Sequence, residues 1–173
     1  AGFAGFRAEG FEPQRTVVTT NESLDGREVS VRNYPGTMGT RIADAMRAVV
    51  PNADCALLNG GSIRIDDVVN PGPLVEYDII RILPFGGQIL SNTIKGSLLK
   101  KVLLQGLANK GKGGFLHHSG ITRDGENWLI NGSPLEETKT YTVAMSDFLV
   151  SGRETGLDYL KEGNPELKIG ANH

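Results

Sequence analysis

The sequence predicts an α+β fold in which a mixed β-sheet is flanked by helices. Helix-like and strand-like segments alternate along the chain, and tight turns instead of helices join some of the strand-like segments. The length of 173 residues agrees with one domain, since a domain of this size buries roughly 70% of the surface that its unfolded chain exposes. We therefore expect a single domain over residues 14–173, preceded by a linker stub at residues 1–13.

The first part of the domain predicts extended segments followed by a helix. β-Branched residues at positions 16–19 favour a strand, residues 24–26 favour a turn, and residues 29–32 favour a second extended segment. Apolar residues then recur at helical spacing over residues 37–50. Thr37 is the expected N-cap of this helix, and Pro51 is expected to end it.

The middle of the chain predicts a buried strand and a second helix. Residues 55–58 form an apolar run that ends at the turn Asn59-Gly60-Gly61, whereas residues 76–83 fit either a short helix or a strand. Residues 88–95 are strand-like, and Gly96-Ser97 is expected to cap the helix that follows. The apolar face of this helix consists of Leu98, Leu99, Val102, Leu103 and Leu107, with Lys100, Lys101 and Gln105 facing water.

The last part of the chain predicts mainly strands and loops. Residues 109–114 form a loop of glycine and lysine, and residues 121–130 predict a hairpin that turns at Asp124-Gly125. Tyr141, Val143 and Met145 alternate as in a strand, and residues 156–162 could form a last short helix.

The charges and the reactive side chains exclude several functions. The 18 basic and 20 acidic residues nearly cancel and form no long block, which disfavours a nucleic-acid polymer or a membrane as partner. Cys55 lies in an apolar run, which is typical of the core. His117, His118 and His173 lack the spacing of a metal site, and the adjacent pair is typical of a solvent-facing loop. We expect neither a metal nor a cofactor in this chain.

Three strand ends carry glycines beside charged or aromatic residues. They are residues 59–64, 83–87 and 146–156. Ligands often bind at such strand-end loops, because the backbone there approaches a ligand closely. These loops are therefore the candidate binding site.

Five motifs occur in an order that resembles the C-terminal domain of 5′-nucleotidases, over about residues 16–160. They are Met38-Gly39 with Ala43-Asp44-Ala45-Met46, Leu58-Asn59-Gly60-Gly61-Ser62-Ile63-Arg64, Leu83-Pro84-Phe85-Gly86-Gly87, Gly114-Phe115-Leu116, and Phe148-Leu149 with Gly152. The resemblance implies a two-domain, periplasmic or extracellular enzyme. Its N-terminal metallophosphoesterase domain, absent from this chain, would hold two divalent metal ions, and this domain would bind a nucleotide or nucleoside. The chain alone is then expected to fold and to have no catalytic residues.

The resemblance also assigns roles to individual residues. Phe85 and Phe148 match the two aromatic rings between which the family stacks the base. Asn59 matches a residue that binds the edge of the base, and Gly61 would let the backbone pass close to the ligand. At the other end of the nucleotide, Arg64 matches an arginine that reaches the phosphate or ribose, and a surface ion pair with Asp66 or Asp67 is its alternative.

Two further assignments follow from the resemblance. Arg32 is chosen as the second arginine, although the segment after it departs from the family pattern. Glu154 stands nearest to the aspartate that accepts hydrogen bonds from both ribose hydroxyls, with Asp147 and Asp158 as competitors. If Glu154 binds the diol, ribonucleotides should be preferred to 2′-deoxyribonucleotides.

Three functions remain open at this point. The parent protein could hydrolyse nucleoside 5′-monophosphates, or the same chemistry could act on 2′,3′-cyclic nucleotides or UDP-sugars. The third alternative is a non-catalytic nucleoside-binding module. Sequence alone does not separate the first two, because their motifs are shared.

Overall fold

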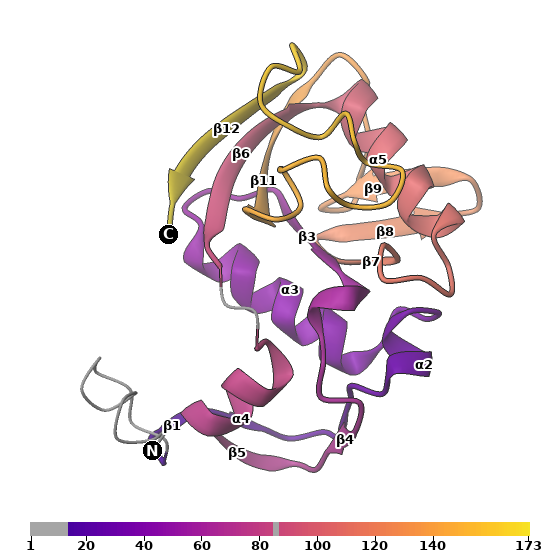
Figure 1. The fold of residues 1–173 in the computed structure, drawn as a ribbon. Helices are drawn as coiled ribbons and strands as arrows, with labels where there is room; N and C mark the ends of the chain where they lie inside the picture. Colours follow the sequence, from indigo (N-terminus) through magenta and orange to yellow (C-terminus); the bar gives the residue numbers. More distant parts are fainter. Residues whose placement is uncertain (1–13, 85–86) are drawn as a thin grey trace.

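The computed structural model describes residues 14–84 and 87–173, and its centre is a five-stranded sheet (Figure 1). The strands lie in the order β12 (Leu167–Asn172), β6 (Ile89–Lys95), β11 (Thr140–Ser146), β3 (Cys55–Asn59) and β7 (Leu116–Ser119). β3 and β11 are parallel, and the other neighbouring strands are antiparallel. The predicted mixed sheet with flanking helices is confirmed.

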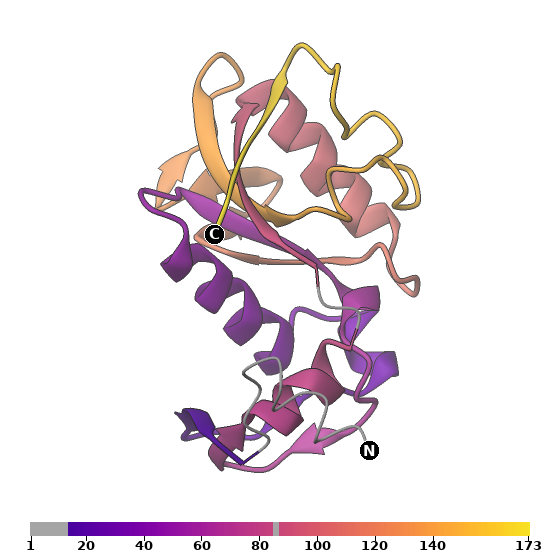
Figure 2. The ribbon, with the colours of Figure 1, turned by 60° about the vertical axis from the view of Figure 1, so that its left-hand side comes forward.

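One long helix packs on each face of this sheet. α3 (Thr37–Val49) and α5 (Gly96–Ala108) lie on opposite sides of it (Figure 2). Along β3, Cys55 and Leu57 belong to the apolar cluster of α5, whereas Ala56 and Leu58 belong to that of α3. Successive side chains of a strand point to opposite faces, so a strand covered on both sides reads as a continuous apolar run.

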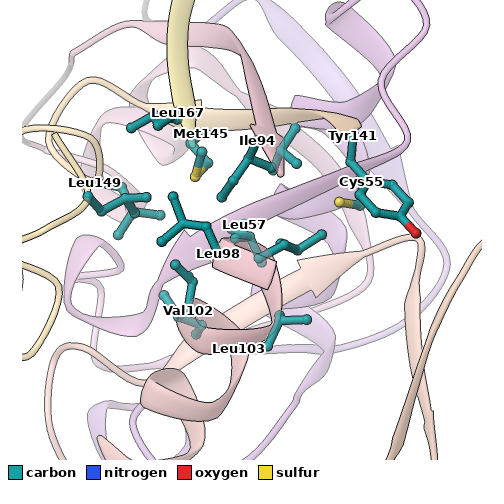
Figure 3. Packing of buried hydrophobic residues seen from close by; sticks show 14 of the residues in the cluster. Cys55, Leu57, Ile94, Leu98, Val102, Leu103, Tyr141, Met145, Leu149 and Leu167 are labelled. Atoms are coloured by element: carbon teal, nitrogen blue, oxygen red, sulfur yellow. The ribbon is translucent and has the colours of Figure 1, made fainter. Parts of the chain in front are cut away.

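The larger apolar cluster lies between α5 and the sheet (Figure 3). Leu98 and Val102 of α5 face Leu57 and Ile94 of the sheet, and all four side chains are at most 2% exposed. The same cluster includes Leu149, Leu157 and Leu160, from the segment after β11. This segment is therefore fixed by burial, although it contains no long regular element.

Smaller elements surround the sheet. β1 (Thr16–Thr20) pairs with β5 (Gly72–Val75), β2 (Leu24–Asp25) pairs with β4 (Val68–Val69), and β9 (Asn127–Ile130) pairs with both β8 (Ile121–Asp124) and β10 (Ser133–Pro134). The remaining helices are short: α2 (Glu28–Val31), α4 (Glu76–Ile82) and the 3₁₀ turn η1 (Gly60–Ser62).

Several local predictions were wrong. Residues 24–25 form a short strand instead of a turn, and residues 29–32, expected to be extended, lie largely in α2. The N-cap of α3 is Gly36, because the Thr37 hydroxyl accepts from the Asp25 N–H (2.9 Å) and donates to the Ser23 carbonyl (3.0 Å). A tertiary contact to β2 therefore replaces the predicted local cap.

Three further predictions, two on α5 and one on residues 156–162, were wrong. Gly96-Ser97 provides no side-chain cap for α5, because the Ser97 hydroxyl donates to Glu166 (2.6 Å). Leu107, predicted on the apolar face of this helix, is 38% exposed, and Gly106 packs against Leu116 instead. Residues 156–162 form turns instead of a helix, with Gly156 at φ +73°. The alternative left open at residues 76–83 resolves as the helix α4.

The expectation that His117 and His118 lie in a solvent-facing loop was also wrong. Both residues are in β7, and His117 is 2% exposed. The His117 Nε2 lies 2.7 Å from the Val31 carbonyl oxygen, and the ring occupies the space that a side chain at Gly39 would need, with a Cβ there only 2.1 Å from Nδ1. The imidazole therefore fills the contact between α3 and β7, as a neutral donor to Val31.

We predict that the free energy of unfolding falls as the pH drops below about 6.5. Burial lowers the pKa of His117, although the bond to Val31 opposes this, and burial together with neighbouring His117 lowers the pKa of His118. Below about pH 6.5 the unfolded chain therefore binds more protons than the folded chain. The contribution of the neutral histidines to the free energy of unfolding is complete above that pH and is lost as the pH falls through their lowered folded-state pKa values. Urea unfolding followed by circular dichroism from about pH 8 to about pH 5 measures this. His117→Gln keeps a donor for Val31 and should flatten the dependence; an unchanged slope would contradict the assignment.

Candidate functional site

The three candidate strand-end loops meet at one edge of the central sheet. β3 and β11 run parallel, so Asn59 and Ser146 end these strands at the same edge. β6 is antiparallel to β11, with Ile89 opposite Ser146, and therefore begins at that edge. A Cβ at Gly87, just before β6, would lie 2.8 Å from the Asp147 Oδ1 atom, so the second and third loops touch.

Asn59 and Glu154 form a buried hydrogen bond across 95 positions of the sequence. The Asn59 Nδ2 donates to Glu154 Oε2 (2.9 Å), and the Ser62 hydroxyl donates to Asn59 Oδ1 (2.6 Å), which fixes the orientation of the amide. The Thr155 N–H donates to Glu154 Oε1 (3.0 Å). With Asn59 4% and Glu154 9% exposed, this pair is the buried centre of the site.

Glu154 is thus the carboxylate that reaches Asn59, whereas its competitors are exposed. The Asp147 Oδ1 accepts from the Phe148 N–H (2.9 Å), and Asp158 lies on the surface. A carboxylate offers about four acceptor positions, and two of those of Glu154 are used by protein donors. The remaining positions can accept further hydrogen bonds, such as those of a vicinal diol.

Phe148 begins the turn that carries Glu154 into the site. Its ring is half-buried, and the guanidinium carbon of Arg153 lies 5.2 Å from the ring centre, within the range of a cation–π contact. The Arg153 Nε donates to the Ser151 hydroxyl (3.1 Å), which holds the guanidinium there. Phe85, the predicted second ring, lies outside the described residues, as does the predicted linker at residues 1–13.

The two predicted arginines border the same backbone contact, between Gly61 and Gly113. The Gly61 N–H donates to the Gly113 carbonyl (2.8 Å), and the Arg64 Nε donates to the Gly61 carbonyl (2.7 Å). A Cβ on Gly113 would lie 4.0 Å from the Arg32 guanidinium carbon. Arg32 also pairs with Glu28 at 3.2 Å. The structure therefore places both cations beside the glycine and lysine loop, at one end of the Asn59 turn.

Two residues that the sequence did not indicate support this site, the half-buried Ser62 and the buried Asn109. Ser62 orients the Asn59 amide, and Asn109 joins the glycine and lysine loop to the turn after Glu154 by donating to the carbonyls of Gly114 (3.3 Å) and Thr155 (2.8 Å). The signal for Asn109 was weak, since an asparagine at the end of a helix is common without any ligand.

Across residues 14–84 and 87–173, no three His, Cys, Asp or Glu side chains are arranged to hold a metal ion, and no helix has the length and apolar character to cross a membrane. Burial raises the pKa of Cys55 to about 12, which leaves an inert thiol. A shallow depression beside Arg32 is lined also by Arg27, Glu28, Val29, Asn33, Asp66 and Gly111.

Known structures share this fold. The 5′-nucleotidase precursor from Thermus thermophilus superimposes with a TM-score of 0.77 over 96% of this chain and 36% of its own length, at 24% identity. At that identity the similarity shows the fold alone. It places the chain in a class of α+β domains built on a mixed five-stranded sheet with a long helix on each face.

Sequence comparison then gives the family. Residues 16–162 match the model of the 5′-nucleotidase, C-terminal domain family, and the chain belongs to this family. It is 30% identical over 143 residues to the protein UshA of Yersinia enterocolitica, and 33% identical over 156 residues to the trifunctional nucleotide phosphoesterase protein YfkN of Bacillus subtilis. These matches cover 79% and 77% of the chain but only 25% and 10% of the two relatives. The chain thus spans a quarter or less of their length.

We predict that Asn59→Asp lowers the free energy of unfolding at neutral pH by about 1–3 kcal/mol, because it sets a second carboxylate against Glu154. Urea unfolding at neutral pH, followed by circular dichroism, measures the difference. Asn127→Asp, at an exposed position of β9, is the control and should change stability little. Equal losses in both variants would contradict the contact.

Proposed function

We propose that this chain is the nucleotide-recognition domain of a metal-dependent 5′-nucleotidase. The longer parent protein would hydrolyse nucleoside 5′-monophosphates to nucleoside and phosphate. Membership of the family and the partial coverage of larger relatives support this role. The observation that carries the proposal is the buried hydrogen bond between Asn59 and Glu154 (2.9 Å). It lies at the edge of the central sheet where β3 and β11 end, close in sequence to Phe148.

The nucleoside would bind through stacking and through hydrogen bonds. The base would lie between Phe85 and Phe148, and a base stacked on an aromatic ring contributes about 1–3 kcal/mol in single-strand binders. Asn59 would bind the edge of the base, Glu154 would accept from the ribose hydroxyls, and Arg32 and Arg64 would face the phosphate. The predicted role of Gly61 changes, because a Cβ there would lie 3.0 Å from the Gly113 Cα atom, so this glycine lets the Asn59 turn and the glycine and lysine loop touch.

The hydrolysis itself would take place on another domain of the parent protein. Two divalent metal ions there would polarise the phosphate and activate a water molecule. The residues of this chain would contribute orientation and specificity, since a metal pair of that kind acts on many phosphoesters. By the same family argument, we propose a periplasmic or extracellular location for the parent protein.

The similarity to YfkN favours a second candidate within the same class. That relative is named a trifunctional nucleotide phosphoesterase, and the two chains are 33% identical over 156 residues. The alternative substrate that we propose is a 2′,3′-cyclic nucleotide or a UDP-sugar. A non-catalytic nucleoside-binding module is the alternative outside the hydrolase class.

We predict that the chain binds adenosine and AMP, and binds 2′-deoxyadenosine about tenfold more weakly, because the missing hydroxyl leaves an acceptor of Glu154 unpaired. Amide chemical shifts of the ¹⁵N-labelled chain measure the dissociation constants. Phe85→Ala and Phe148→Ala should each weaken adenosine binding by about 5- to 150-fold. Tyr77→Ala, which removes a 42% exposed ring on α4, is the control. No response at millimolar adenosine, or unchanged affinity in both Phe variants, would refute the nucleoside site.

We also predict that residues 1–173 alone release no phosphate from AMP when Mg²⁺, Mn²⁺ or Zn²⁺ is added, whereas the longer parent protein does. A colorimetric phosphate assay measures the release, and a chelator should abolish it in the parent protein. Release that scales with the concentration of the isolated chain would show that catalysis does not need another domain. A parent protein that binds nucleoside without any turnover would favour the non-catalytic module.

A further inference from the structure

Asn109 is a buried amide with a single possible orientation. It follows α5 and is 2% exposed. Its Nδ2 donates both hydrogens to backbone carbonyls, of Thr155 (2.8 Å) and Gly114 (3.3 Å), and its Oδ1 accepts from Gln105 Nε2 (3.0 Å). Because a flipped amide would set an oxygen against two carbonyl oxygens, these partners fix the side chain.

The two carbonyl groups that Asn109 binds belong to residues on either side of the Glu154 carboxylate. Thr155 donates its N–H to Glu154 Oε1 (3.0 Å) and accepts from Asn109 with its carbonyl. On the other side, a Cβ at Gly114 would lie 2.5 Å from the Asn109 Nδ2 and 2.9 Å from Glu154 Oε1. The Glu154 carboxylate thus rests against the Gly114 backbone, where only a glycine fits.

These contacts form a continuous support for one carboxylate. Asn59 holds the Oε2 atom, while Thr155 and the surface of Gly114 define the position of Oε1. Asn109 donates to the carbonyls of both Thr155 and Gly114. Its loss would free these two residues to move away from Oε1, while the hydrogen bond from Asn59 to Oε2 would remain. A displacement of about 1 Å is enough to weaken a hydrogen bond to a ligand strongly.

We propose that Asn109 is a positioning residue that sets the Glu154 carboxylate for a ribose diol and thereby determines the preference for ribonucleosides. The proposal rests on the proposed role of Glu154. It assigns the specificity of the site to a side chain that touches no ligand, at the junction of α5 and the glycine and lysine loop.

Asn92 offers a matched control for the test. It is also a fully buried asparagine, 0% exposed, and its Nδ2 also donates to two backbone carbonyls, those of Leu90 (3.1 Å) and Val143 (3.3 Å). It lies within the central sheet, in β6, instead of beside Glu154. Asn92→Ala therefore removes the same kind of buried hydrogen bonds without releasing the carboxylate.

The experiment compares dissociation constants for adenosine and 2′-deoxyadenosine, measured by amide shifts in the full chain of residues 1–173. Asn109→Ala should weaken adenosine binding about tenfold and leave 2′-deoxyadenosine within about twofold, so that the ribose preference disappears. Asn92→Ala should leave the preference intact. A preference that survives Asn109→Ala would overturn the proposal, and Asn109 would then serve stability only.

Two further variants keep the outcomes distinct. Glu154→Ala should abolish the ribose preference; if it does so while Asn109→Ala does not, the positioning role fails and the proposed nucleoside site stands. An unchanged chain with no ribose preference would refute the role of Glu154 and this proposal together.

Asn109→Asp provides a test if the alanine variant is unstable. Its carboxyl can donate to Thr155 only when protonated, so the preference should be low at mildly alkaline pH and recover at acidic pH, and equal preference at both would overturn the proposal.

Discussion

The parallel pairing of β3 with β11 is the constraint on which the rest of the structure depends. It joins residues far apart in the sequence, with Val143 opposite Cys55, and it directs both carboxyl ends to one edge of the sheet. The turn after β3 and the turn after β11 must then lie together, so Asn59 meets Glu154 there. A reversed β11 would carry Glu154 to the opposite edge, and no local change in either loop could restore the contact.

Burial on both faces keeps this pairing in register. Ala56 and Ala144 are opposite each other in the α3 cluster, whereas Cys55 and Val143 face α5, and all four are 0% exposed. A shift of one strand by one residue would turn each of its side chains to the opposite face of the sheet. Small alanines would then lie under α5, and larger residues would lie under α3. The packing on the two helices thus specifies the geometry of the loops at the strand ends.

The sequence was a good guide wherever one periodicity or one turn motif determined the outcome, as in α3, α5, β3 and the hairpin of residues 121–130. The turn of that hairpin lies at residues 125–126, one position after the predicted Asp124-Gly125. It failed where a distant partner decided the local structure. The Thr37 hydroxyl binds β2 instead of capping its own helix, and His117 is enclosed by Gly39 and Val31, far from it in sequence. The bond from Asn59 to Glu154 belongs to this second kind, because no pattern within either loop encodes it.

The solvation of Glu154 explains why this site should respond to a ligand. Among the described residues, the donors to its carboxylate are the Asn59 amide and the Thr155 N–H, both of them neutral. A carboxylate that is 9% exposed and bound by two neutral donors has lost most of its hydration without full replacement. Hydroxyl donors from a diol would complete its hydrogen bonds, so ligand binding and the stability of the turn after β11 should be coupled. The position of this carboxylate is therefore sensitive to neighbours such as Asn109. Only a few hydrogen bonds from described residues hold the carboxylate, so the loss of one changes its position more than it would in a larger network.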